Sequence, residues 1–249
     1  MALLVILTLL VCSPVLYYFF VLRSNTDALW QIVSQKCLPS HQLQQGPGAC
    51  LLVDQENQYV LFKDRNGPHH DLLMPTFPVS GLEAPILEDR AAPSFVAMAW
   101  ATKGRLAEEA GFPIPDPYLS LAINSRLGRS QDHLHIHISC LKPEVAQVLG
   151  RQASGITAEW SEIPEPVLGK QYLARRIAAD ALAGENPIVM LNDYLRAQGQ
   201  APGDYGLGVA QLADGDLALL ATGRKLLSLD LGSIGRMQDF TCSLAQNPG

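Results

Sequence analysis

The sequence predicts an α+β fold in which an antiparallel sheet packs against helices and is preceded by one N-terminal transmembrane helix. Three observations carry this prediction. The first 22 residues contain no charged side chain. Between residues 49 and 140, strand-like runs lie on both sides of one long helix-like segment. The last of these runs carries three histidines that alternate with aliphatic residues, which is the period of a β-strand.

The N-terminal segment Met1–Leu22 is long enough to cross a bilayer, because about 20 helical residues span the hydrocarbon core. Pro14 interrupts this segment, but transmembrane helices tolerate proline. A cleaved signal peptide is the alternative, yet the segment has no basic start and no small-x-small cleavage site before the polar residues that follow it. We therefore expect an uncleaved, single-pass anchor at residues 1–22 and a folded domain at residues 26–249.

Composition limits the classes of function. Apolar residues make up 48% of the 249 residues and charged residues 17%, which excludes disorder for most of the chain and allows a large core. The formal net charge is -6, and no run rich in lysine and arginine occurs. A surface that binds nucleic acid therefore has little support.

Cysteine usage indicates the compartment. Outside the apolar segment the chain has Cys37, Cys50, Cys140 and Cys242. Proximity suggests that Cys37 pairs with Cys50 and that Cys140 pairs with Cys242, but four cysteines allow three connectivities and buried free thiols are an alternative. An even count favours an oxidising compartment such as the periplasm of a bacterium, with the anchor in the inner membrane. Arg23 after the anchor mildly favours the opposite orientation.

The first elements after the anchor are a helix and three strands. Residues 26–37 have apolar side chains at helical spacing, and Asp27 could cap the start of that helix. Three extended runs with turn residues between them follow at residues 49–54, 59–63 and 71–76.

A proline-rich connection at residues 76–93 leads to a helix at residues 94–111. Ser94 is the expected N-cap of this helix, and Gly111 is expected to end it. Two more strands follow at residues 118–124 and 133–140, and they complete a core of about residues 45–142.

The second half, about residues 143–249, is also predicted to be α+β. Residues 143–152 have the pattern of a helix, and strands are expected near 205–212 and 217–222, around a turn at Asp214–Gly215. No internal repeat is evident in the sequence, but two sheets of similar size would be compatible with one.

The histidine run is the most informative stretch of the sequence. Because side chains alternate along a strand, His133, His135 and His137 project from one face, and the aliphatic residues between them pack behind it. A merely solvated polar face would explain the pattern without any function. In a second interpretation the imidazoles bind a metal, as in a cupin-like barrel, with His69 or His70 as further ligands. In a third, one imidazole attacks phosphorus, because neutral histidine is available at physiological pH.

The residues around this run resemble the histidine-triad (HIT) superfamily. The stretch from Gly128 to Ser139, GRSQDHLHIHIS, matches its signature of a glycine and a serine before H-φ-H-φ-H-φ-φ. Upstream, FKD at 62–64 and LLMP at 72–75 resemble the nucleotide-binding segment of that superfamily. Within it, the chain is similar to the CDP-diacylglycerol pyrophosphatase family over nearly its whole length, including the Tyr172–Arg176 run YLARR and the cysteines. The resemblance implies a HIT-like fold and a catalytic domain that needs no metal or other cofactor.

The resemblance also assigns the catalytic roles. His135 would attack a phosphorus of the pyrophosphate and form a covalent intermediate that water then cleaves, while a backbone carbonyl holds its other ring nitrogen. His133 and His137 would bind phosphoryl oxygens, and one of them would relay a proton to the leaving group.

The substrate-binding residues implied by the resemblance are Asp64, Asn124, Arg126, Gly128 and Ser130. Asp64 would bind ribose hydroxyls, although an ordinary turn aspartate is the alternative. Asn124 and Ser130 would position phosphate oxygens, and Arg126 with Arg129 would neutralise the pyrophosphate. His133 follows Asn124 by nine positions, fewer than in the commonest triad pattern, so the sequence departs from that pattern at Asn124.

Together these features predict hydrolysis of CDP-diacylglycerol to CMP and phosphatidate by an enzyme that is held at the membrane. We expect this enzyme to bind no nucleic acid and to act as a monomer. A lipid product suits an anchored enzyme. A cupin-like metal-dependent enzyme that uses the histidine face, and a non-catalytic module that binds a nucleotide-lipid, are the alternatives.

Overall fold

A computed structural model of the protein describes residues 26–89, 92–225 and 230–246. The predicted anchor at residues 1–22 lies outside these ranges. Within them, no helix is both long enough and apolar enough to cross a membrane.

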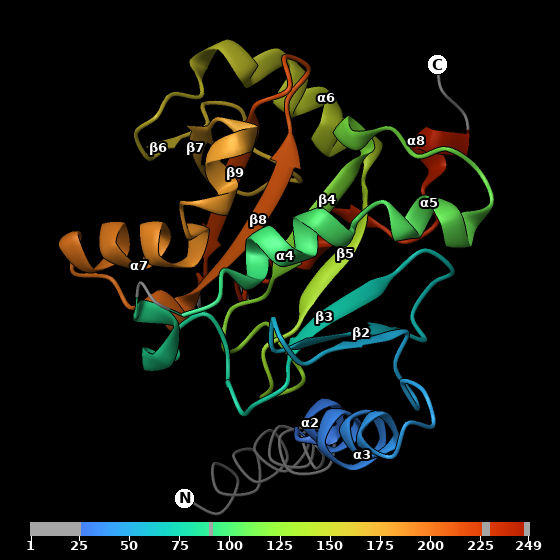
Figure 1. Ribbon diagram of the computed structural model, residues 1–249. Coiled ribbons are helices and arrows are strands. Elements are labelled where there is room, and N and C mark those ends of the chain that lie inside the picture. The colour runs from blue at the N-terminus through green and yellow to red at the C-terminus, as the bar shows by residue number, and fades with distance from the viewer. Residues whose placement is uncertain (1–25, 90–91, 226–229, 247–249) are drawn as a thin grey trace, which may run out of the picture.

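The centre of the fold is one antiparallel sheet, as the sequence predicts (Figure 1). Its strands lie in the order β1-β2-β3-β5-β4-β8-β9-β7-β6, and β10 pairs with β5 beside this path. The strands are β1 (Leu52–Asp54), β2 (Tyr59–Lys63), β3 (Asp71–Pro75), β4 (Leu119–Ile123), β5 (Ile136–Leu141), β6 (Ser161–Glu162), β7 (Leu173–Ile177), β8 (Tyr205–Gln211), β9 (Leu217–Gly223) and β10 (Gln238–Asp239).

The two halves of this sheet have the same topology, a repeat that is not evident in the sequence. A strand pair, a helical connection and a second strand pair occur first as β2, β3, β4 and β5, and again as β6, β7, β8 and β9. Antiparallel pairing of β4 with β8 joins the halves. The connecting helices α4 (Phe95–Thr102) and α7 (Pro187–Ala197) contribute to the same core cluster, so both cover one face of the sheet.

The helix predicted at residues 94–111 is interrupted. It forms α4 and then α5 (Arg105–Ala110), with a break at Lys103–Gly104, because glycine is a poor helix former. Gly111 ends α5 in the left-handed conformation, φ +74°, as predicted. The prediction that Ser94 caps the helix is wrong, since its side chain makes no cap hydrogen bond and its hydroxyl is buried without a partner among the described residues.

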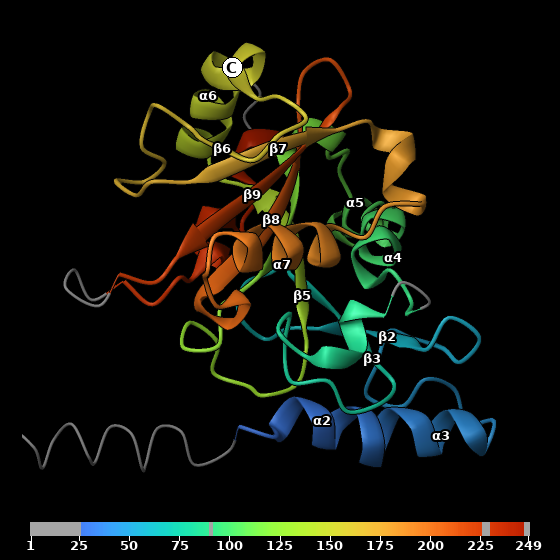
Figure 2. The ribbon, with the colours of Figure 1, turned by 90° about the vertical axis from the view of Figure 1, so that its left-hand side faces the viewer.

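The opposite face of the sheet is covered at one end by the helix predicted from residue 26. It consists of α2 (Ala28–Ile32), a π-helical turn η1 (Val33–Cys37) and α3 (Leu38–Gln42), which Figure 2 shows as one continuous rod below β2 and β3. The apolar side of this rod packs on alternate residues of those strands, such as Val60 and Leu72. Asp27 precedes α2 but makes no side-chain cap hydrogen bond, contrary to the prediction.

The second half contains the predicted helix α6 (Pro143–Gln152) and the predicted hairpin of β8 and β9. The remaining helical elements are short: η2 (Pro85–Glu88), η3 (Asp116–Tyr118), η4 (Ala153–Gly155), η5 (Ala179–Ala183), η6 (Pro202–Asp204), η8 (Ile234–Met237) and α8 (Ser243–Gln246). Arg176 on β7 binds Asp214 and Asp216 at the hairpin turn, so its charge is balanced within this half.

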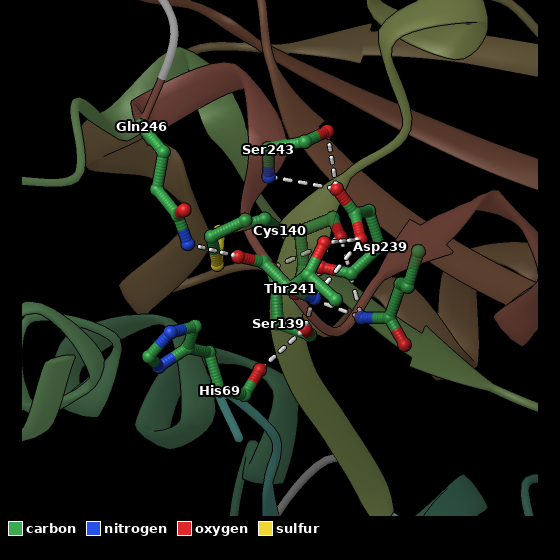
Figure 3. The surroundings of a disulfide bond; sticks show 10 residues. His69, Ser139, Cys140, Asp239, Thr241, Ser243 and Gln246 are labelled. Atoms are coloured by element: carbon green, nitrogen blue, oxygen red, sulfur yellow. Dashed lines mark hydrogen bonds between the residues drawn. A yellow bond between two sulfur atoms is a disulfide. The ribbon is translucent and has the colours of Figure 1, made fainter. Parts of the chain in front are cut away.

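Both disulfides that proximity suggested are present. Cys37 at the end of η1 is bonded to Cys50, and Cys140 on β5 is bonded to Cys242 (Figure 3). The first ties the helical rod to the start of the sheet. The second ties the C-terminal segment to the strand that carries His137.

Candidate active site

The predicted histidine face exists, but the strand that carries it is shorter than expected. β5 begins at Ile136, so His133 and His135 lie in the segment just before it. The backbone N–H of Leu134 donates to the carbonyl of Val79 instead of to a ladder partner. The side chains of Leu134, Ile136 and Ile138 are buried in the core on the α4 side of the sheet, as the alternation predicts.

The sheet places this face between two covered regions. His137 pairs with Leu72 on β3 and with Ala122 on β4, and cross-strand partners share a face. Leu72 packs beneath the helical rod, and Ala122 belongs to the core cluster that includes α6. His137 therefore lies on the strip of the sheet between the part that the rod covers and the part that α6 covers.

His135 is held in one tautomer by its own loop. Its Nδ1 lies 2.6 Å from the backbone oxygen of His133, and because a carbonyl can only accept, Nδ1 must carry the proton. Neutral imidazole then has its lone pair on Nε2. Burial lowers the pKa of His135, so the ring is neutral at physiological pH. This is the state that a nucleophilic histidine requires.

His137 belongs to a directed chain of hydrogen bonds. The N–H of Gly235 donates to Asn124 Oδ1 at 2.9 Å, which turns the amide nitrogen of Asn124 toward His137 Nε2 at 3.3 Å. On the other side, His137 Nδ1 lies 2.8 Å from His70 Nε2, and His70 Nδ1 donates to the carbonyl of Asn66 at 2.9 Å. The Asn66 carbonyl can only accept, so His70 carries its proton on Nδ1 and accepts at Nε2. His137 Nδ1 must then donate to His70, and His137 Nε2 accepts from the Asn124 amide, so His137 also carries its proton on Nδ1.

His133 is engaged differently. Its Nε2 donates to the backbone oxygen of Pro75 at 3.0 Å, and its ring lies 5.1 Å from that of Trp30 on α2. Burial lowers the pKa of His133 to about 4, so this ring too is neutral at physiological pH. In this arrangement the clearest contribution of His133 is its backbone oxygen, which orients His135.

His70 belongs to this hydrogen-bond network, although sequence reasoning named it only as a possible metal ligand in a turn-like segment. It is 1% exposed, and its ring stacks on Phe240 with centroids 3.9 Å apart. Asp64 Oδ1 accepts from both nitrogens of Asn66 at 2.7 Å and lies 3.9 Å from His70 Nδ1. Asp64 therefore stabilises a turn, as an ordinary turn aspartate would, and it also places a carboxylate beside the histidine network.

The loop before the triad is ordered by its own contacts. The hydroxyl of Ser125 accepts the N–H of Gly128 at 2.9 Å, and a Cβ at Gly128 would lie 2.7 Å from the hydroxyl of Ser233. Arg129 is buried and is paired with Glu83 and with Asp132. Its charge is thus balanced within the fold.

Arg126 and Ser130, the other two loop residues assigned to substrate, lie on the exposed surface of this loop. Asn124 and Asp64 are brought to the histidine network instead, through His137 and His70 respectively.

For a metal site, three or more ligand side chains must converge. In the described ranges, no group of three His, Cys, Asp or Glu side chains is arranged to do so. The nitrogens through which His70 and His137 face each other are already used in their mutual hydrogen bond.

Acidification is expected to destabilise the fold, because burial lowers the pKa of His70, His133, His135 and His137. Below pH about 6.5 the unfolded chain binds protons that the folded state excludes, so the free energy of unfolding falls, by at most about 1.4 kcal/mol per pH unit for each histidine. For His133 this window extends down to about pH 4. Urea unfolding at pH 7 and pH 5 measures the effect. His133→Asn should reduce the loss of unfolding free energy between these two pH values. A free energy of unfolding that does not change with pH would contradict the conclusion that the histidines are buried in their neutral form.

Comparison with known proteins gives one extensive match. The family model described as CDP-diacylglycerol pyrophosphatase matches residues 24–246. Among solved structures, the crystal structure of aprataxin ortholog Hnt3 in complex with DNA aligns at 18% identity and a TM-score of 0.32, over 49% of this chain and 66% of that one. Hnt3 in complex with DNA and guanosine aligns at 19% identity and a TM-score of 0.30, over 46% and 68%. The chain thus spans just under two thirds of the first of these structures, and both TM-scores are too low to bear on the fold.

Proposed function

The chain belongs to the CDP-diacylglycerol pyrophosphatase family, whose members are hydrolases of a phosphoanhydride bond, and from that premise we propose that it cleaves CDP-diacylglycerol to CMP and phosphatidate through a covalent intermediate on His135. The observation that carries the proposal is the hydrogen bond from His135 Nδ1 to the backbone oxygen of His133. It leaves the Nε2 lone pair of a neutral ring available for attack.

The first step forms a bond between His135 Nε2 and one phosphorus of the pyrophosphate, and the bond from that phosphorus to the bridging oxygen breaks. CMP or phosphatidate leaves with the bridging oxygen, depending on which phosphorus is attacked. The phosphorylated imidazolium that forms keeps its Nδ1 proton, and the backbone oxygen of His133 continues to accept the hydrogen bond from Nδ1. Water then attacks the same phosphorus, the P–N bond breaks, and His135 returns to its neutral state.

The chain of histidines supplies a place for a proton during these steps. His137 Nε2 can accept the proton that the attacking water loses once the Asn124 amide no longer donates to it. The charge then moves on when the Nδ1 proton of His137 transfers to His70 Nε2, 2.8 Å away. The resulting cation on His70 would lie 3.9 Å from Asp64, whose negative charge favours the protonated ring. On this proposal His137 and His70 act as a relay, and Asp64 stabilises its charged form.

The test of this function is CMP release from CDP-diacylglycerol in mixed micelles by the full-length protein. We expect the same rate in EDTA as in buffer, because the histidines supply the nucleophile and no step needs a metal. Activity that EDTA abolishes and zinc restores would instead support the metal-dependent alternative. No release under either condition would leave only a binding module.

Trapping tests the covalent step itself. Two substrates would carry radioactive phosphorus, one in the CMP phosphate and one in the phosphatidate phosphate. Alkaline quenching during turnover should leave acid-labile label on the protein from one of the two, because a P–N bond survives alkali better than acid. The labelled substrate identifies the phosphorus that His135 attacks, and label from neither would contradict the intermediate.

We also propose that the protein is a single-pass protein of a bacterial inner membrane with its folded domain in the periplasm, and that it acts as a monomer without nucleic acid. Two disulfides support an oxidising compartment. The second half extends the sheet from β4, so an edge where another copy could pair is filled within the chain. Protease accessibility of the domain in spheroplasts tests the orientation.

A further inference from the structure

The last part of the chain lies along the histidine strand. Residues 234–242, which we call the C-terminal strap, comprise η8, β10 and the turn that ends at Cys242. Gln238 and Asp239 pair with Leu141 and Cys140 of β5, and the disulfide closes the strap to the same strand (Figure 3).

The strap contacts both partners of His137. At its start, the N–H of Gly235 orients the Asn124 amide that donates to His137 Nε2. In its middle, the side-chain nitrogen of Gln238 donates to the backbone oxygen of His137 at 3.3 Å. Near its end, Phe240 stacks on His70, the residue that accepts from His137 Nδ1. Three separate contacts of one segment thus converge on one histidine.

The stack of Phe240 on His70 is close and nearly parallel, with centroids 3.9 Å apart and planes 6° apart. The backbone on both sides of the stack is fixed. His69 N–H donates to the carbonyl of Phe240 at 3.0 Å, and the hydroxyl of Ser139 donates to the carbonyl of His69 at 2.6 Å. A Cβ at Gly67 would lie only 2.4 Å from the Cβ of Phe240, so only glycine allows this approach.

The strap itself is held by Asp239. Its carboxylate accepts hydrogen bonds from the backbone and side chain of both Thr241 and Ser243 (Figure 3). Burial alone would raise the pKa of Asp239, but these hydrogen bonds together outweigh it and lower the pKa to about 2, so the carboxylate is ionised at physiological pH. Phe240 lies within this turn.

We propose that Phe240 is a positioning residue for the hydrolytic reaction, which acts through His70 to keep His137 in the Nδ1–H tautomer. This inference rests on the proposed function. The two nitrogens of His70 face different partners. A 180° flip of the ring would put Cε1 in the place of Nε2 and Cδ2 in the place of Nδ1, so it would withdraw the acceptor from His137 and the donor from the Asn66 carbonyl. The flat contact with Phe240 restrains that rotation. With His70 fixed, His137 Nε2 keeps its lone pair.

The test compares Phe240→Ala with Phe240→Tyr in the full-length protein. Phe240→Ala should lower kcat roughly tenfold to hundredfold with little change in KM, because small misplacement of a reacting group costs that much. Phe240→Tyr keeps the ring and should retain most of kcat. The matched control is Phe112→Ala, since Phe112 makes an edge contact with the neighbouring His69, which is outside the relay, and should leave kcat unchanged.

Imidazole ¹⁵N spectra separate positioning from folding and do not depend on substrate. In the wild type and in Phe112→Ala, His137 and His70 should each show one tautomer, protonated at Nδ1. In Phe240→Ala both should show mixed tautomers, while circular dichroism stays that of the wild type. Wild-type kcat and unmixed tautomers in Phe240→Ala would overturn the inference. A wild type that shows one tautomer but never releases CMP, together with mixed tautomers in Phe240→Ala, would instead count against the proposed function alone.

Discussion

Replacing His135 with alanine is expected to reduce CMP release from CDP-diacylglycerol by at least about 10⁴-fold, because the nucleophile of a covalent mechanism has no substitute in the site. Substrate binding should be little changed, since the other polar groups of the site remain. The measurement is single-turnover CMP formation in mixed micelles together with the Kd of the substrate.

Two comparisons make this prediction specific. His41→Ala removes a histidine on α3, outside the site, and should leave the rate unchanged. Added imidazole should partly restore CMP formation by His135→Ala, because a small nucleophile can enter the space that the side chain vacates. If His135→Ala keeps more than a small fraction of the wild-type rate, another group attacks phosphorus and the covalent mechanism proposed for His135 is wrong.

The sequence was sufficient for the features that depend on local periodicity. Extended runs bounded by turn residues at 59–63 and 71–76 predict β2 and β3. Alternation of the histidines predicts which side chains share a face. That the aliphatic residues between the histidines are buried follows from the same period. The two flanking rings also led us to predict His135, the middle histidine, as the nucleophile, and this role stays a prediction.

Features that depend on distant contacts could not be found in this way. His70 joins His137 across 67 positions of sequence, and its neighbours have the composition of a turn. The carbonyl that orients His135 is a backbone atom, which no residue type marks. The pairing of Arg129 with Glu83 spans 46 positions, so the pattern of the loop alone suggested a free cation where the fold provides a partner.

The topological repeat shows a related limit. α4 and α7 cover the same face of the sheet between equivalent strand pairs, but only the first half carries histidines on the equivalent strand. The corresponding strand β9 is apolar from Leu217 to Ala221. Side-chain identity therefore hides the relation, and backbone pairing reveals it. The second half contributes instead through its end, the strap that returns to β5.

The two disulfides are expected to differ in their contribution to stability, because the loops they close differ in length. Cys140–Cys242 spans 102 positions and Cys37–Cys50 spans 13. From loop-closure entropy, replacing Cys140 and Cys242 with serines should lower the free energy of unfolding by roughly 4–5 kcal/mol. Replacing Cys37 and Cys50 should lower it by about 3 kcal/mol. Urea unfolding of both double variants in detergent measures the difference.

Activity under conditions where both variants stay folded adds a second distinction. The long disulfide holds the strap against β5, so its loss should also lower kcat by the route proposed for Phe240. The short disulfide joins the helical rod to the sheet and makes no contact with His70 or His137, so its loss should change stability alone. Equal stability losses would argue that native contacts, and not loop length, set the contribution of each bond. Equal effects on kcat would argue that the strap has no special relation to the relay, because only Cys140–Cys242 holds the segment that contacts His70.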